Sequence, residues 1–120
     1  MHSIPTHSPS NVCALDDRDP KNGNASHRYG IQTPAPMLPM VEIVYIHGPR
    51  GEPGTKPGIF DDDLLAIAED RLEGFQSGPY ACHENAEALE HVKAARKWLS
   101  VRLAKRMAQG VLGKNQAHSS

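Results

Sequence analysis

Large apolar and aromatic side chains are scarce in this chain of 120 residues. Hydrophobic residues make up 38% of the sequence and aromatic residues 5%, so we expect one domain at most, with a small core. No apolar run is long enough to span a membrane, and the opening stretch MHSIPTHSPS lacks the basic-then-apolar order of a signal peptide. These absences predict a soluble protein of the cytoplasm.

Cysteine is also scarce. Cys13 lies in a polar segment and Cys82 at the entry to a helical pattern, so the two do not indicate a disulfide framework. A reducing compartment is the simpler assumption for such a chain.

An excess of charge of one sign is absent too, since the formal net charge is -1. A general nucleic-acid binder carries a clearly basic balance, so this value argues against a nucleic-acid polymer as partner. The charges are nevertheless separated along the chain. Acidic residues dominate from Asp61 to Glu73, and every charge from Lys93 to Arg106 is positive.

The first part of the chain has little pattern. Residues 1–39 are rich in Pro, Ser, Asn, Asp and His without a period of 2 or 3.6, which predicts a disordered or extended tail. The run VEIVYI, Val41 to Ile46, is the one convincing strand. The following HGPRGEPGTKPG alternates Gly with Pro, which excludes a helix and predicts a loop.

Two helices follow. Asp61 can cap the first, in which Leu64, Leu65, Ala68, Leu72 and Phe75 recur at helical spacing until Gly74 and Ser77–Pro79 end it. The second starts near Cys82 and continues to Gly110, about 26 residues, and residues 114–120 are expected to fray.

A short connection such as QSGPYA folds two helices back on each other. The predicted fold class is therefore α+β: a short N-terminal β element followed by an antiparallel two-helix hairpin, together covering residues 40–113. One strand and two helices bury too little apolar surface for a stable monomer, so we expect an oligomer. Val92, Ala95, Trp98 and Leu99 are the residues predicted to be shared between chains.

The usual catalytic motifs do not occur. The chain has no phosphate-binding P-loop, no dinucleotide fingerprint, no HExxH and no GxSxG, so no catalytic residue is predicted. Cys82 and His83 are adjacent, so their side chains diverge on a helix, and no second pair of zinc ligands accompanies them. We predict no metal and no cofactor.

A constellation suited to binding remains. Aromatic and guanidinium planes sandwich a purine, an Asn side chain contacts a base edge or a ribose hydroxyl, and Arg binds phosphates bidentately. Asn85 and Arg102 lie 17 positions apart, about 25 Å on one helix, so a pocket that uses both needs a second, antiparallel chain. The candidates are Phe75, Gln76, Tyr80, Asn85, Arg102 and Arg106.

Each candidate also has a structural interpretation. Phe75 continues an apolar stripe and fits a core position, and Tyr80 can simply pack on the turn. Asn85 can serve as a first-turn hydrogen-bonder, and Arg102 and Arg106 can pair with the Asp61–Asp63 cluster of the partner helix.

Residues 47–113 resemble the phage domain shared by anti-CBASS and anti-Thoeris sponge proteins, and more closely the anti-Thoeris branch. The resemblance is carried by the HGP loop, DLLAI at Asp63–Ile67, DRLEGFQSGP at Asp70–Pro79, CHEN at Cys82–Asn85, and the segment from Trp98 to Arg106. It covers a little over half of the chain.

The resemblance implies a non-enzymatic homo-oligomer, a dimer or a trimer of dimers, that sequesters nucleotide second messengers of bacterial immunity. The ligands implied are cyclic ADP-ribose isomers for Thoeris and cyclic di- or trinucleotides for CBASS. The pocket lies between two subunits, which implies ligand-binding roles for Phe75, Asn85, Arg102, Arg106 and Arg50, with Gln76, Tyr80 and His83 as further candidates.

The chain departs from this pattern at two positions. His83 stands where the usual motif CREN has Arg, and Glu90 lies near a usual Thr. Loss of a fixed positive charge at His83 makes phosphate binding weaker or pH-dependent near neutrality.

The function predicted from the sequence is therefore a phage or prophage immune-evasion protein that binds a cyclic nucleotide without cleaving it. Two alternatives stay open at this stage. One is a small oligomeric helical hairpin that docks a protein partner, and the other is a DNA-binding helix that uses the basic run, which Glu84, Glu87 and Glu90 on the same helix disfavour.

Overall fold

The computed structural model describes residues 1–35, 38–48 and 52–109. The chain divides into two units, the first formed by Met1–Ile59 and the second beginning at Phe60 and containing both helices. Among the described residues, only Ala14 in the first unit and Leu89 in the second are buried hydrophobic residues, with exposed fractions of 0% and 8%.

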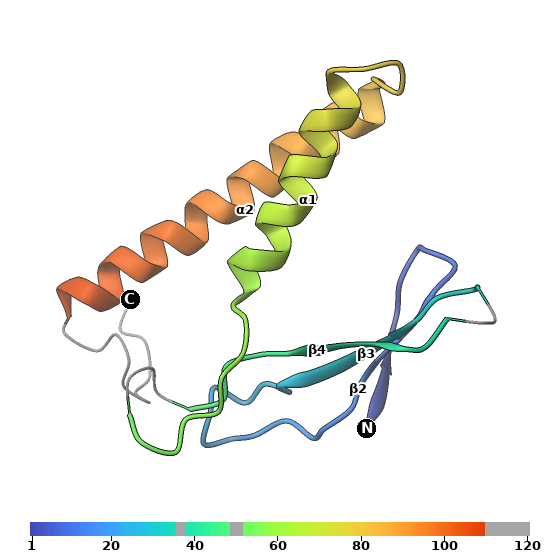
Figure 1. Ribbon diagram of the computed structural model, residues 1–120. Helices are drawn as coiled ribbons and strands as arrows, with labels where there is room; N and C mark the ends of the chain where they lie inside the picture. Colours follow the sequence, from blue (N-terminus) through green and yellow to red (C-terminus); the bar gives the residue numbers. More distant parts are fainter. Residues whose placement is uncertain (36–37, 49–51, 110–120) are drawn as a thin grey trace. The chain divides into compact units, whose positions relative to one another are not determined.

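The first unit is an antiparallel sheet whose strands follow one another in chain order (Figure 1). Strand β1 is His2–Ile4, β2 is Asn11–Ala14, β3 is Arg28–Gln32 and β4 is Val41–Val44. Each strand pairs with the next one in the chain, so no crossover connection is needed.

The register gives the sheet one apolar face. Ile4 lies opposite Val12, Val12 opposite Ile31, and Ile31 opposite Val41, so a row of β-branched side chains crosses all four strands. Such cross-strand pairs stabilise a sheet by packing side by side.

The other face carries charge. Arg28 on β3 donates from Nε to Glu42 Oε1 on β4 at 2.8 Å. The ion pair on one face and the β-branched row on the other favour this register, because a slip of one residue would move the side chains of a strand to the opposite face of the sheet.

The structure differs here from the sequence-based expectation. Three of the four strands lie within residues 1–39, for which the sequence indicated a disordered or extended tail, and the expected short β element around VEIVYI is the last strand of a four-stranded sheet. The strands are three to five residues long and half polar, so they carry almost no local periodicity. Pairing with neighbouring strands, which the local pattern does not encode, makes them strands.

The Gly- and Pro-rich segment after β4 returns to the sheet. Tyr45 and Ile59 form a parallel bridge, and His47 and Lys56 an antiparallel one. Gly58 runs so close to the Tyr45 backbone that a side chain would not fit. Because β4 and this return belong to the sheet unit, the division between the two units falls after Ile59.

The second unit is a helical hairpin in which α1, Asp61–Gln76, lies antiparallel beside α2, His83–Ala108 (Figure 1). The α+β class and the two-helix hairpin predicted from the sequence are thereby confirmed. Phe60, rather than Asp61, occupies the capping position, and its backbone nitrogen donates to Asp63 Oδ2 at 2.8 Å. The predicted frayed end, residues 114–120, lies outside the described residues.

Helix α2 begins at a less usual cap. Cys82 precedes it with extended backbone angles, and its Sγ accepts from the backbone nitrogen of Asn85 at 3.4 Å. The helix has 26 residues, as the spacing of apolar positions predicted, and Lys105 and Arg106 lie in its last turn where the helix dipole favours positive charge.

Charged residues hold the two helices together. Arg96 on α2 donates from Nε to Asp62 Oδ1 at 2.8 Å and lies 3.2 Å from Glu69 Oε2, both on α1. Lys93 lies 3.8 Å from Glu73. The predicted neutralisation of α2 by α1 is thus present, but at Arg96 and Lys93 rather than at Arg102.

Candidate functional site

The tip of the hairpin gathers aromatic and cationic groups. Phe75, in the last turn of α1, and Tyr80, in the connection to α2, have ring centroids 6.4 Å apart and planes 82° apart. The Arg71 guanidinium lies over the Phe75 ring, 5.4 Å from its centroid. Since 36% of Phe75 and 75% of Tyr80 remain exposed, this platform is open to a ligand.

Polar side chains fix the connection that carries Tyr80. Gln76 Oε1 accepts from the backbone nitrogen of Cys82 at 3.0 Å, and Asn85 Nδ2 donates to the Tyr80 carbonyl at 3.3 Å. Two candidates for ligand binding therefore also hold the turn in shape, and the first-turn hydrogen bond considered for Asn85 is present. The amide oxygen of Asn85 has no partner among the described residues, so it can accept from a base or a hydroxyl.

The remaining candidates lie on α2. His83 is exposed, and its Nε2 lies 3.9 Å from Glu87 Oε1 one turn later. Arg102 and Arg106 are near the opposite end of the helix, Arg102 exposed and Arg106 half-buried. One chain thus brings Phe75, Tyr80 and Asn85 together, but it leaves the arginines about 25 Å from them.

Arg50, the candidate in the Gly- and Pro-rich segment, lies outside the described residues.

Arg96 and Arg102, both on α2, differ in whether they form an ion pair with α1. Hydrogen bonds between Arg96 and Asp62 lower the pKa of the Asp62 carboxyl and raise that of the guanidinium. Arg96 is therefore committed to the hairpin. Within the described part of the chain, Arg102 has no ion-pair partner. The ion pair between Arg102 and the Asp61–Asp63 cluster that the sequence also allowed is therefore not observed.

Sequence reasoning missed Arg71 and Arg96. Arg71 precedes Phe75 by four positions, which on a helix places a cation over the ring, and that spacing was available as a signal. The role of Arg96 had no such signal, because several basic residues of α2 have the same local context and only the docking of α1 selects one of them.

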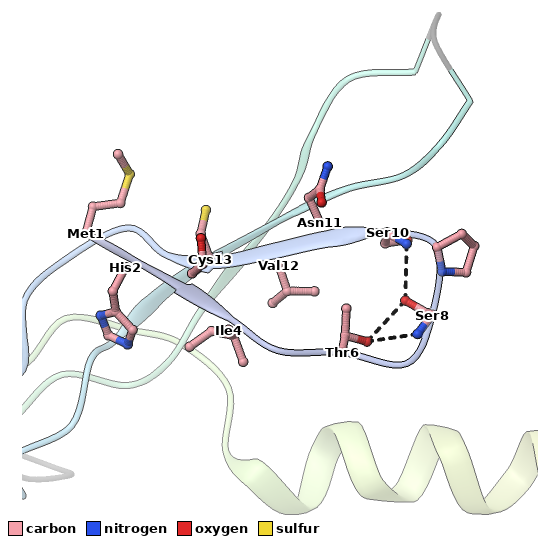
Figure 2. A pocket seen from close by; sticks show the side chains of 11 residues that line it. Met1, His2, Ile4, Thr6, Ser8, Ser10, Asn11, Val12 and Cys13 are labelled. Atoms are coloured by element: carbon pink, nitrogen blue, oxygen red, sulfur yellow. Dashed lines mark hydrogen bonds between the residues drawn. The ribbon is translucent and has the colours of Figure 1, made fainter.

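A hollow of about 750 Å³ lies in the sheet unit beside β1, β2 and their connecting turn (Figure 2). Hydroxyls shape that turn: Thr6 Oγ1 lies 3.2 Å from Ser8 Oγ, which in turn accepts from the Ser10 backbone nitrogen at 3.3 Å. None of the candidate residues on the helices lines this hollow.

The part of the chain that the structure describes contains no group of three or more His, Cys, Asp or Glu side chains placed to hold a metal ion. None of its helices is both long and apolar enough to cross a membrane.

Comparison with known proteins identifies a family that contains this helical hairpin. The family model described as "Acb2/Tad1, hairpin domain" matches residues 37–104, more than half of the chain. The chain belongs to this family. The resemblance to the domain shared by anti-Thoeris and anti-CBASS proteins is thereby confirmed.

A relative of this family member is the protein named Thoeris anti-defense 1 from Bacillus phage SBSphiJ7. The two are 38% identical over 69 residues, which is 58% of this chain and 48% of the relative. The chain spans about half the length of this curated relative. The family match includes β4, α1 and most of α2, whereas β1–β3 precede it and Arg106 lies just beyond its end.

Proposed function

We propose that this family member is a phage or prophage immune-evasion protein that binds and sequesters a cyclic nucleotide second messenger without degrading it. The ligand we favour is a glyco-cyclic ADP-ribose isomer, with cyclic di- or trinucleotides as the other members of the class. Family membership and the name of the phage relative support the role in evasion. The observation that carries the ligand class is the exposed platform of Phe75, Tyr80 and Arg71.

The chemistry of the platform fits a purine nucleotide. A base stacks on the face or edge of an aromatic ring, and each stacked base contributes about 1–3 kcal/mol to binding. The acceptor oxygen of Asn85 lies in the same turn as the ring that would hold the base. Guanidinium groups such as that of Arg102 then bind the phosphates through charge-assisted hydrogen bonds.

The proposed pocket needs two chains. The platform and Arg102 lie near opposite ends of α2, so an antiparallel second copy would bring its arginines to the platform of the first. Burial within the chain supports such an assembly, because Ala14 and Leu89 are the only buried hydrophobic residues among those described, while Ile67 and Trp98 are 58% and 69% exposed. We infer a homo-oligomer, a dimer or a trimer of dimers, in which these side chains are covered.

Sequestration requires no chemical step. A protein in excess of its messenger lowers the free concentration by mass action if the dissociation constant is nanomolar, which corresponds to about 12 kcal/mol. Stacking together with several charge-assisted hydrogen bonds in a pocket closed by a second chain is of this order. In this proposal the chain acts in the bacterial host cell and has no catalytic residue.

The decisive experiment captures the ligand and recovers it. Purified protein is mixed with a panel of cyclic ADP-ribose isomers and cyclic di- and trinucleotides, filtered, and then heat-denatured, and both fractions are analysed by chromatography. We expect one class to disappear from the filtrate and to return intact on heating. Conversion to a product would make the protein an enzyme, and a panel left wholly in the filtrate would favour the protein-interaction hairpin.

Arg102→Ala locates the phosphate contact. Loss of a hydrogen bond to a charged group costs about 1.5–3 kcal/mol, so the captured ligand should bind roughly ten- to a hundredfold more weakly, measured by calorimetry. Lys97→Ala is the matched control, since Lys97 is an exposed cation of the same helix that is not a candidate for the site. Equal weakening by both changes would mean that only general positive charge matters and that the pocket is misplaced.

A further inference from the structure

Two histidines of the sheet unit stack face to face. His27 precedes β3 and is 8% exposed, while His47 follows β4. Their ring centroids are 3.9 Å apart and their planes differ by 7°. Two neutral imidazole rings can stack at this distance, but two positively charged imidazolium rings would repel each other.

The pair joins two segments that are distant in the sequence. His47 Nε2 lies 2.9 Å from Asp19 Oδ2, and the Asp19 carboxylate also accepts from the backbone nitrogen of Lys21 at 3.0 Å and from Asn22 Nδ2 at 2.6 Å. Asp19 therefore organises the turn that ends at Ala25, where the two residues form a bridge.

On its other side, His47 forms the base of the Gly- and Pro-rich segment. Its backbone nitrogen donates to the Lys56 carbonyl at 3.1 Å, and the Lys56 nitrogen donates to the His47 carbonyl at 2.9 Å. Gly48 has a φ of +117, and a Cβ at this position would lie 3.0 Å from Thr55 Oγ1, so glycine suits it. The ring of His47 thus holds this segment to the turn that begins at Asp19.

The two rings differ in how they accommodate a proton. A proton on His47 Nε2 faces the Asp19 carboxylate. His27 Nδ1 is buried and has no hydrogen-bond partner among the described residues, so a proton there would create a buried charge without an acceptor. A positive charge on His27 is therefore disfavoured while the two rings are stacked.

The surrounding charges come from both segments. Asp16 lies beside His27, but its carboxylate already accepts from the backbone nitrogens of His27 and Arg28 at 3.0 Å. Lys21 and Lys56 line, together with His47, a hollow of about 420 Å³. These lysines oppose a second positive charge on the ring pair, while Asp16 and Asp19 favour it.

Burial, followed by the nearby His47, lowers the pKa of His27 from its ordinary value of 6.5, and the two aspartates offset this in part. A hydrogen bond from His47, followed by that from Asn22, lowers the pKa of Asp19 to about 2. The carboxylate that faces His47 therefore stays ionised throughout the range in which histidines titrate.

We propose that the stacked rings of His27 and His47, with the Asp19 carboxylate, form a proton-sensitive clasp whose opening on acidification breaks the backbone bridge between His47 and Lys56. Because the pKa of His27 is lower in the clasped state, the opened chain takes up the proton first. The clasp is consequently complete above about pH 6.5 and weakens as pH falls below it. This inference does not depend on the nucleotide that the helices bind.

Nuclear magnetic resonance on the full chain tests the clasp. Hydrogen-exchange protection of the His47 and Lys56 amides is measured from about pH 7.5 to about pH 5, together with titration of the His27 ring. Protection, corrected for the intrinsic pH dependence of exchange, should fall by up to about tenfold per pH unit below 6.5, with the amides of α2 unchanged. Protection of the two amides that stays constant to pH 5 would overturn the proposal.

The substitution His27→Phe distinguishes the effect of protonating the ring from the effect of its flat shape. His27→Phe keeps a flat ring for the stack but cannot be protonated, so the two amides should become independent of pH in this range. His91→Phe, at an exposed position of α2, is the control and should leave the profile of the wild type. A His27→Phe protein with the wild-type profile would refute the role of His27.

A second variant covers the case in which His27→Phe does not fold. Asp19→Asn keeps an acceptor oxygen for the turn and removes the negative charge that faces His47. The decrease in protection should then continue to a lower pH and be larger at pH 5 than in the wild type, because the Asp19 charge partly offsets the lowered pKa of His27. A decrease equal to that of the wild type would contradict the clasp.

Discussion

The sheet unit and the helical hairpin are stabilised in different ways. The sheet buries the side chains of Ser26 and His27 and relies on close backbone approach at Gly58. The hairpin relies on a stripe of half-buried apolar residues around Leu89 and on ion pairs to Arg96. A sheet of this kind depends on individual fits, whereas a hairpin tolerates change at most positions of its stripe.

The largest expected effect tests the fit in the sheet. In Gly58→Ala, the new Cβ would lie 2.5 Å from the Ile46 backbone nitrogen, and backbone atoms cannot give way as a side chain would. We expect the free energy of unfolding to drop by about 3 kcal/mol, with loss of the bridge between Tyr45 and Ile59. Denaturant titration with amide resonances of the sheet as the probe measures this loss.

Gly74→Ala is the matched change in the hairpin. Gly74 lies in α1 with open space around the position of its missing Cβ, so alanine should stabilise the helix by about 0.5–1 kcal/mol. If both substitutions had the same sign, the contrast between a fitted sheet and a tolerant hairpin would be wrong.

The next effect concerns the hairpin stripe. Leu89→Ala removes the one buried hydrophobic side chain among the described residues of the hairpin and should cost about 2 kcal/mol. Leu103→Ala on the same helix, at a side chain that is 45% exposed, should cost clearly less. Both are compared by far-UV circular dichroism at equal protein concentration, since association would add to stability. Equal losses would show that a partner chain covers Leu103.

The smallest effect comes from the ion pairs. Arg96→Met keeps the aliphatic stem and removes the guanidinium from Asp62 and Glu69, and the loss of stability should be smaller than for Leu89→Ala, because these side chains are 22–47% exposed. Lys97→Met is the control.

The same substitution has a pH signature. The hydrogen bond from Arg96 lowers the pKa of Asp62 below its ordinary 3.8, so the pair stabilises the fold above that pH, and its contribution is lost as pH falls through the folded value. Arg96→Met should therefore flatten the decrease in stability below about pH 4. If the stability of Arg96→Met decreases below pH 4 as steeply as that of the wild type, other carboxylates cause the decrease.

The helices were predictable from the sequence and the sheet was not. Apolar residues at spacings of three and four, a Gly-Pro break and the acidic first turn predicted α1, α2 and their antiparallel arrangement. Strands β1–β3 are short, and His27, Asp19 and His47 come together only when β2, β3 and β4 pair. Local composition therefore predicted a tail where tertiary pairing makes a sheet.

The candidate site divides in the same way. The grouping of Phe75, Tyr80 and Asn85 at one turn follows from chain proximity, and Phe75 and Asn85 lie within two of the motifs that carried the family resemblance. That Arg96 rather than Arg102 pairs with the acidic helix was decided by the tertiary structure, because the docking of two helices selects among chemically equal side chains by geometry alone. By itself, the sequence determined which aromatic, amide and guanidinium side chains are present and the helical spacing at which they recur. The fold decided which of them meet, since long-range contacts depend on the whole chain.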